Sequence, residues 1–261
     1  MNKKAKELGL ENTNFVTPHG LDQDEHYTTA YELALITNYA LNNKKFAQIV
    51  NTKQTTININ GNQKQISNTN ELLGNLKGVD GVKTGFTNNA GRCLVTSTTR
   101  NGHKIISVVL GADTKKIRTK DSVKLIEYAF SNYEYINIKE KIENKFEEWK
   151  NTQLKNIEIV KGINKFPQIK LDNLQFDEVP INKNKIKDIK VEVTYKNILQ
   201  APIQENDIIG EIKVMQKEEI IATVNILLKE KIEKKDMTDY IKQFITKYSI
   251  YLEQAMKIDQ I

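Results

Sequence analysis

Three consecutive residues, Lys83, Thr84 and Gly85, carry the clearest chemical signal in this chain. They place an amine, a hydroxyl and a position without a side chain inside the run 81–86, whose composition predicts a strand. A Lys-Thr-Gly triplet alone is a weak signal, because three common residues recur by chance and Lys83 is equally well interpreted as an exposed strand lysine. The elements around the triplet must therefore decide its meaning.

The neighbouring segments predict a three-stranded region with helices on either side. Thr29 and Glu32 have the spacing of a capping box at a helix start. Asn60-Gly61 and Asn101-Gly102 each lie between two alternating runs and predict tight hairpin turns. The expected elements are a helix at 1–8, a helix at 29–41, a hairpin at 55–66, strands at 81–86, 93–98 and 105–110, and a helix at 121–130.

Beyond Tyr135 the composition becomes charged and rich in asparagine, and the periodicity changes. Short alternating runs predict a small all-β module, with strands at 157–160, 189–193, 208–214 and 220–228. The tail returns to helix over 236–258 with one apolar side, formed by Ile241, Phe244, Ile245, Tyr248, Tyr251, Leu252, Ala255 and Met256. We expect domains at 1–138 and 139–232, followed by an amphipathic helix within 233–261 that packs on protein or binds a membrane surface.

The bulk composition is that of a globular chain and excludes several classes of protein. With 261 residues, 39% hydrophobic and 28% charged, the chain has room for two domains and contains no apolar run of membrane-spanning length. The net charge of +6 comes from lysines spread among acidic residues, which disfavours a nucleic-acid partner. Cys93 is the single cysteine, and His19, His26 and His103 lie far apart, so we expect no metal and no cofactor.

The segments on either side of the triplet, 70–82 before it and 86–95 after it, make the Lys-Thr-Gly signal more specific. This stretch resembles the low-molecular-weight penicillin-binding proteins, the serine D-alanyl-D-alanine carboxypeptidases. The loop at 12–22 is similar to the loop that flanks the family's active site, and 201–203 with 210–212 resembles its C-terminal β domain. The resemblance implies an α+β fold: the C-terminal part of a β-lactamase/transpeptidase-like domain, with an antiparallel sheet and helices, then a small all-β domain and an amphipathic C-terminal helix.

The same resemblance implies a role for each residue of the strand. Lys83 would hold a positive charge beside the nucleophile and the substrate. Thr84 would offer its hydroxyl to the carboxylate of a peptide ending in D-Ala-D-Ala, while the strand backbone pairs with that peptide. Gly85 would permit close approach, and the backbone N–H of Phe86 would be the second oxyanion donor.

Arg118 and His19 are the two candidates outside the strand. Arg118 occupies the position of the family's carboxylate-binding arginine, and a planar guanidinium suits that task. Taken without the family, Arg118 is one cation in a basic run and a solvated surface role is favoured. His19 stands between Pro18 and Gly20, where a histidine lines the site or serves the loop structure.

The bond-breaking residues of the family are missing from this sequence. The family needs a serine followed three residues later by lysine, and a Ser-x-Asn motif. None of the six serines meets either pattern. The helix at 1–8 resembles the one that follows Ser-x-Asn, so we expect both motifs, and the signal peptide, upstream of residue 1 in an N-terminally truncated chain.

Three functions remain open. The first is the C-terminal portion of a carboxypeptidase that trims D-alanine from peptidoglycan stem peptides on the outer face of the cytoplasmic membrane, with the tail helix on that membrane and β-lactams as ligands of the full-length protein. The second is a non-catalytic muropeptide-binding or cell-wall scaffold protein. The third, a β-lactamase, would not ordinarily carry the β domain and tail helix.

A fluorescent penicillin should leave this chain without a covalent label. The reason is that an acyl-enzyme requires the serine nucleophile, whose loss costs on the order of a million-fold in rate. Denaturing electrophoresis after incubation measures the label. Stable stoichiometric labelling would contradict the assignment of the nucleophile to a missing segment.

Overall fold

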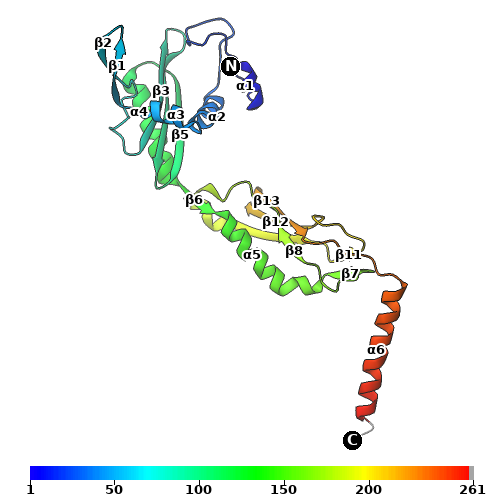
Figure 1. Ribbon diagram of the computed structural model, residues 1–261. Coiled ribbons are helices and arrows are strands. Elements are labelled where there is room, and N and C mark those ends of the chain that lie inside the picture. The colour runs from blue at the N-terminus through cyan, green and yellow to red at the C-terminus, as the bar shows by residue number, and fades with distance from the viewer. Residues whose placement is uncertain (259–261) are drawn as a thin grey trace. The chain divides into compact units, whose positions relative to one another are not determined.

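The computed structural model describes residues 1–258, with side chains described for residues 1–250. The chain forms two compact units, Met1–Tyr133 and Glu134–Ile261, which are described separately (Figure 1).

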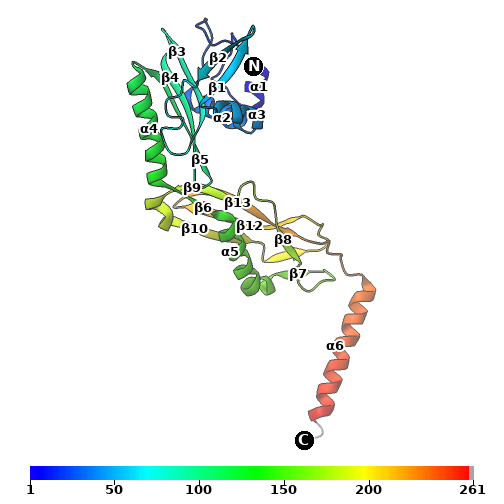
Figure 2. The ribbon, with the colours of Figure 1, turned by 60° about the vertical axis from the view of Figure 1, so that its left-hand side comes forward.

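The first unit is built on a three-stranded antiparallel sheet of order β3-β4-β5. Helix α4 lies on one side of this sheet, and α2 and α3 lie on the other (Figure 2). The elements of this unit are α1 (Asn2–Glu7), α2 (Ala30–Leu41), α3 (Lys44–Val50), β1 (Gln54–Ile59), β2 (Asn62–Ser67), β3 (Val79–Thr87), β4 (Gly91–Arg100), β5 (His103–Ala112) and α4 (Lys115–Asn132). The predicted strands, hairpins and first two helices are present, whereas α3 was not expected.

Both predicted hairpin turns have the backbone that their sequences favour. Asn60 and Gly61 have φ of 51° and 85°, and Asn101 and Gly102 have φ of 51° and 82°. Two successive left-handed residues match a type I′ turn, which joins two strands with a loop of two residues. The pairs Ile59↔Asn62 and Arg100↔His103 close these turns. The Asn-Gly signal therefore determined both strand registers locally.

The core of the first unit lies between the sheet and α4. Leu94 on β4 and Ile126 on α4 are fully buried, and Leu72, Leu73 and Val79 join them. Arg100 at the end of β4 donates to both carboxylate oxygens of Glu127 at 3.0 and 2.6 Å, which lowers the pKa of Glu127 and ties α4 to the sheet.

The second unit contains a four-stranded antiparallel sheet of order β10-β12-β13-β8. Two smaller pairs accompany it, β6 with β9 and the parallel pair β11 with β7. Its elements are β6 (Tyr133–Asn137), α5 (Ile138–Gln153), η1 (Leu154–Asn156), β7 (Glu158–Val160), β8 (Ile169–Leu171), β9 (Glu178–Asn182), η2 (Lys183–Asp188), β10 (Ile189–Tyr195), β11 (Ile198–Gln200), β12 (Ile208–Gln216), β13 (Glu219–Leu228) and α6 (Met237–Ile258).

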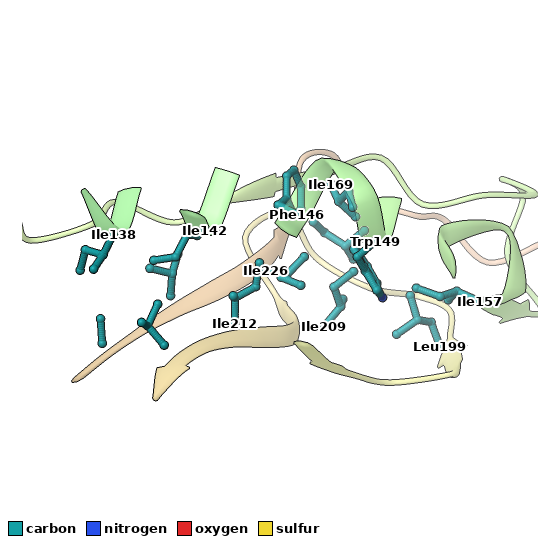
Figure 3. Packing of buried hydrophobic residues seen from close by; sticks show 14 of the residues in the cluster. Ile138, Ile142, Phe146, Trp149, Ile157, Ile169, Leu199, Ile209, Ile212 and Ile226 are labelled. Atoms are coloured by element: carbon teal, nitrogen blue, oxygen red, sulfur yellow. The ribbon is translucent and has the colours of Figure 1, made fainter. Parts of the chain in front are cut away.

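The expected all-β module, 139–232, also contains a helix, and this part of the prediction was wrong. Helix α5 carries Ile138, Ile142, Phe146 and Trp149 on its buried side. These side chains pack against the sheet residues in the core of the unit (Figure 3). The charged remainder of the segment hid this stripe, although spacings of four, four and three residues are those of one helical face.

Helix α6 confirms the expected helix at the end of the chain. Its apolar residues Ile241, Phe244, Ile245 and Tyr248 are all more than half exposed. The predicted continuation of this apolar side, Tyr251, Leu252, Ala255 and Met256, lies outside the residues whose side chains are described, as does the structure of residues 259–261. Among the described residues, none of the helices combines the length and apolarity that a membrane crossing requires.

Candidate functional site

Strand β3 presents the Lys-Thr-Gly triplet along the edge of the sheet. Within the described part of the chain β3 pairs with β4 alone, so its other edge is left without a strand partner. Val79 and Val82 at its start are buried, whereas Lys83, Gly85 and Phe86 are exposed. The ammonium of Lys83 donates a hydrogen bond to the carbonyl of Thr84. The triplet is therefore accessible from outside on a strand whose beginning is anchored in the core.

The hydroxyl of Thr84 lies 2.6 Å from the hydroxyl of Thr69. The residues on either side of Thr69 hold it in place. Asn68 donates to the carbonyls of Val50 and Thr52, and the buried Asn70 donates to the carbonyl of Gly81 at 2.8 Å. The Asn-Thr-Asn segment therefore orients the triplet's hydroxyl. Thr69 was not among the predicted site residues, and only the two flanking asparagines, Asn68 and Asn70, mark this segment in the sequence.

Arg118 does not have the solvated position that its basic neighbours favour. Helix α4 begins at Lys115, six residues earlier than expected, because Thr114 caps it by accepting from the N–H of Ile117 at 3.2 Å. Arg118 therefore lies in the first turn of α4, and only 2% of its surface is exposed.

The guanidinium of Arg118 approaches Glu71, with Nη2 at 3.5 Å from Oε1. Its Nε and Nη2 make no hydrogen bond within the described chain. Because Thr69 contacts Thr84 and Glu71 contacts Arg118, the segment 69–71 brings these two predicted site residues to one place.

Gly85 and Phe86 complete the exposed end of β3. A Cβ at Gly85 would meet only Cys93 Cβ at 3.7 Å, an ordinary contact, so packing within the described chain does not require glycine there. The ring of Phe86 is 51% exposed, and the guanidinium of Arg92 stacks on it at 3.6 Å.

A groove of about 910 Å³ lies between the end of β3 and the loop that precedes α2. Gly85, Phe86 and Cys93 line one side of it, and loop residues 20–24 and 26–28 line the other. His19 is exposed and does not line this groove; its Nδ1 accepts from the N–H of Leu21 at 3.2 Å. His26 does line it and accepts the N–H groups of two loop residues, a role that the sequence did not indicate.

The loop is anchored by a buried carboxylate, Glu32 in the first turn of α2. Burial raises the pKa of Glu32, but hydrogen bonds from the Thr13 hydroxyl and the backbone N–H groups of Asn12 and Glu11 outweigh it, so the pKa lies below its usual value. The capping box places this carboxylate, because Thr29 accepts the N–H of Glu32 at 3.1 Å.

The serines close to the sheet are unsuited to nucleophilic attack. Ser97, Ser107 and Ser122 are buried, and the hydroxyls of Ser107 and Ser122 lie 3.0 Å apart. Ser122 also donates to Thr96 at 3.1 Å, so these hydroxyls join β4, β5 and α4. Among the described residues of the site, none is a serine placed for covalent chemistry; the site offers an open strand edge and cationic side chains.

Comparison with known proteins gives two family matches. Residues 1–114 match the family model described as D-alanyl-D-alanine carboxypeptidase, and residues 149–234 match the penicillin-binding protein 5 C-terminal domain. The chain is thus similar to the D-alanyl-D-alanine carboxypeptidases in its first unit and to the penicillin-binding protein 5 C-terminal domain in its second. The resemblance seen around Lys83-Thr84-Gly85 is confirmed.

The individual relatives agree with this assignment. The chain is 32% identical over 245 residues to D-alanyl-D-alanine carboxypeptidase DacF of Bacillus subtilis, covering 93% of this chain and 60% of that protein. It is 34% identical over 230 residues to DacA of Haemophilus influenzae, covering 87% and 55%. The crystal structure of penicillin-binding protein 5 from Haemophilus influenzae has a TM-score of 0.67 at 28% identity, covering 89% of this chain and 64% of that one. The chain therefore spans somewhat more than half the length of these curated relatives.

Glu32→Gln should destabilise the first unit near neutral pH, and the difference from the unaltered chain should shrink as the pH falls below about 4.5. The sign follows from the lowered pKa: the folded state favours the ionised carboxylate, so its contribution is present above the unfolded-state pKa and is lost on protonation. Thermal unfolding and amide exchange of residues 11–17 at several pH values measure this. Glu11→Gln is the matched control, since that side chain is exposed, and a pH-independent effect of Glu32→Gln would contradict the assignment.

Proposed function

We propose that this chain supplies the substrate-binding part of a peptidoglycan D-alanyl-D-alanine carboxypeptidase. The reaction of the whole protein is removal of the terminal D-Ala of a stem peptide through a serine ester, with the serine and its lysine outside this chain. The observation that carries the proposal is the open edge of β3, where an exposed Lys-Thr-Gly triplet meets the segment that also contacts Arg118.

A stem peptide would bind by adding a strand to β3. An edge strand offers unpaired N–H and C=O groups to an extended peptide, and this backbone pairing requires close approach. Gly85 is consistent with this geometry. Nothing within the described chain would clash with a side chain at position 85, so the glycine is better explained by the close approach of a peptide backbone. Phe86, next along the strand, would donate its N–H to the oxyanion.

The charged groups would hold the terminal carboxylate and the developing negative charge. Lys83 is exposed on β3 and directly precedes Thr84, whose hydroxyl would meet the carboxylate. Arg118 offers Nε and Nη2, which have no hydrogen-bond acceptor in the described chain. The partly exposed side chain of Glu71 approaches the guanidinium. A buried cation gains strongly from a hydrogen-bonded anion, so the substrate carboxylate would compete with Glu71 for this guanidinium. His19 would contribute through the shape of its loop.

β-Lactams would bind the whole protein at the same strand, because they also carry a carboxylate and an acyl group to be attacked. Penicillin binding is stated in the names of the similar solved structures. We place the whole protein outside the cytoplasm, on the outer face of the cytoplasmic membrane, where stem peptides are exposed.

A peptide ending in D-Ala-D-Ala should bind this chain and perturb the amides of β3, residues 79–87, in heteronuclear NMR spectra. Thr84→Val should weaken binding about tenfold, because a hydrogen bond to a charged group contributes roughly 1.5 kcal/mol or more. Thr56→Val, on an exposed strand of the β1-β2 hairpin, should leave affinity unchanged. Equal binding of the L-Ala-L-Ala peptide, or no effect of Thr84→Val, would contradict the proposed site.

Helix α6 would attach the protein to a membrane surface. Ile241, Phe244, Ile245 and Tyr248 recur at helical spacing and are exposed. Among the described residues the rings of Phe244 and Tyr248 stack on each other at 6.3 Å between centroids, so they form a continuous apolar strip. A helix with such a strip and lysines on the remaining surface suits the interface between headgroups and acyl chains.

Ile241→Glu with Phe244→Glu should abolish co-sedimentation of the chain with vesicles that contain anionic lipid. The two carboxylates would have to enter the boundary with the acyl chains. The free-energy cost of burying these charges there exceeds the free energy gained by burying the remaining apolar residues. Gln243→Glu with Thr246→Glu adds the same charge on the opposite side of α6 and should retain most of the binding. Equal loss in both double variants would indicate simple charge attraction and contradict insertion of the apolar strip.

A further inference from the structure

Strand β10 forms an open edge of the sheet in the second unit. It pairs with β12 on one side, and among the described residues it has no strand on the other (Figure 2). The pairing runs without a break from Ile189↔Gln216 to Tyr195↔Gly210.

The backbone groups that face this open edge can be identified from the ladder. Lys196 donates to the carbonyl of Ile209 at 2.8 Å, and Lys217 donates to that of Asp188 at 3.3 Å. Both bonds join residues that stand directly opposite each other in the register. In an antiparallel pair such hydrogen-bonded positions alternate along the strand. Residues 190, 192 and 194 therefore bond to β12, and the N–H and C=O groups of residues 191, 193 and 195 point outward. The N–H of Ile189 donates to the carbonyl of Ile186 at the end of η2, so Ile189 offers only its C=O at the edge.

The side chains of β10 alternate between two environments. Ile189, Val191 and Val193 are partly buried on the core side, where β10 and α5 border a groove of about 480 Å³. Lys190 and Glu192 are exposed on the other face, and within the described chain neither has an ion-pair partner. The open edge thus combines outward backbone groups, an apolar row and two unpaired opposite charges.

We propose that β10 pairs with β10 of a second copy of this chain, antiparallel, about a two-fold axis at Val191. Val191 would then exchange both backbone hydrogen bonds with the same residue of the other copy. The carbonyl of Ile189 would accept from the N–H of Val193 of the other copy. The outward groups of Val191 and Val193 and the outward carbonyl of Ile189 thus give four hydrogen bonds across the two-fold axis in this register. The two four-stranded sheets would form one continuous sheet.

The charges of Lys190 and Glu192 favour this register and a second copy of the chain as the partner. With the axis at Val191, Lys190 lies opposite Glu192 of the other copy, and symmetry forms this pair twice. Side chains at such non-hydrogen-bonded positions are the closest in an antiparallel sheet, and opposite charges there are stabilising. Moving the axis by one residue places Lys190 opposite Lys190 or Glu192 opposite Glu192, which is destabilising.

The apolar row supports the same arrangement. A two-fold axis perpendicular to the sheet keeps the core sides of both sheets on one face, so Ile189 of one copy would lie beside Val193 of the other and Val191 beside Val191. This extends the apolar surface at the groove beside α5 across the axis. The inference concerns the second unit alone and does not depend on the proposed enzymatic function.

Sedimentation equilibrium of the 261-residue chain over a concentration series tests the proposal. Lys190→Glu and Glu192→Lys should each weaken self-association about tenfold, since each places like charges opposite each other twice. An equimolar mixture of these two variants should form a heterodimer as strong as the unaltered dimer, because both cross-strand pairs are then attractive. The double variant Lys190→Glu/Glu192→Lys should also recover self-association.

Thr223→Glu is the matched control, since Thr223 is exposed on β13, two strands from the edge; it should leave association unchanged. Circular dichroism of each variant checks that the fold is retained. A chain that stays monomeric at every concentration would overturn the proposal. Association that is insensitive to the single variants, or that the mixture fails to restore, would overturn pairing through β10.

Discussion

The antiparallel ladder between β3 and β4 positions the four consecutive residues of the candidate site, Lys83 to Phe86. It runs from Val79 to Thr87 and aligns Lys83 through Phe86 on an edge. The ladder satisfies one side of β3, and within the described chain the outer side has no strand partner, which is where we propose that the peptide binds. A strand in the middle of a sheet could not present its backbone in this way, so the proposed peptide binding requires the edge position, which is otherwise a liability for aggregation.

Polar side chains, more than apolar ones, hold the surroundings of that strand. Asn70 bonds the carbonyl of Gly81, Thr69 meets Thr84, and Glu32 gathers the N–H groups of the loop that borders the groove. Buried polar groups of this kind are costly unless they are paired, and their pairing has directional requirements. They therefore define positions at the site more narrowly than apolar packing alone.

The second unit is stabilised mainly by apolar packing. Its core is apolar, with α5 packed on β10 and β12, and it leaves β10 at an edge where Lys190 and Glu192 alternate with apolar residues. The open edges of β3 and β10 differ in the side chains that flank them. The first is flanked by hydroxyl and guanidinium groups, which suit the proposed anionic peptide, and the second carries both charge signs at the spacing on which the proposed pairing with a second copy rests.

The sequence by itself determined the features that depend on neighbouring residues. These include both Asn-Gly turns, the Thr29 cap, the strands of the first sheet and the Lys-Thr-Gly triplet that marks the family. Local steric and hydrogen-bonding preferences act over a few residues and can be inferred without a fold.

The tertiary structure decided the contacts between distant segments. It buried Arg118 against Glu71, set Thr69 on Thr84, brought His26 instead of His19 to the groove, and turned the charged segment after Asn137 into a core helix. The first two contacts join residues 47 and 15 positions apart and depend on the path of the chain between them. The core helix depends on the sheet that buries its apolar stripe. Neither is encoded in the spacing of the residues alone, because the free energy of such contacts exists only once the segments are packed together.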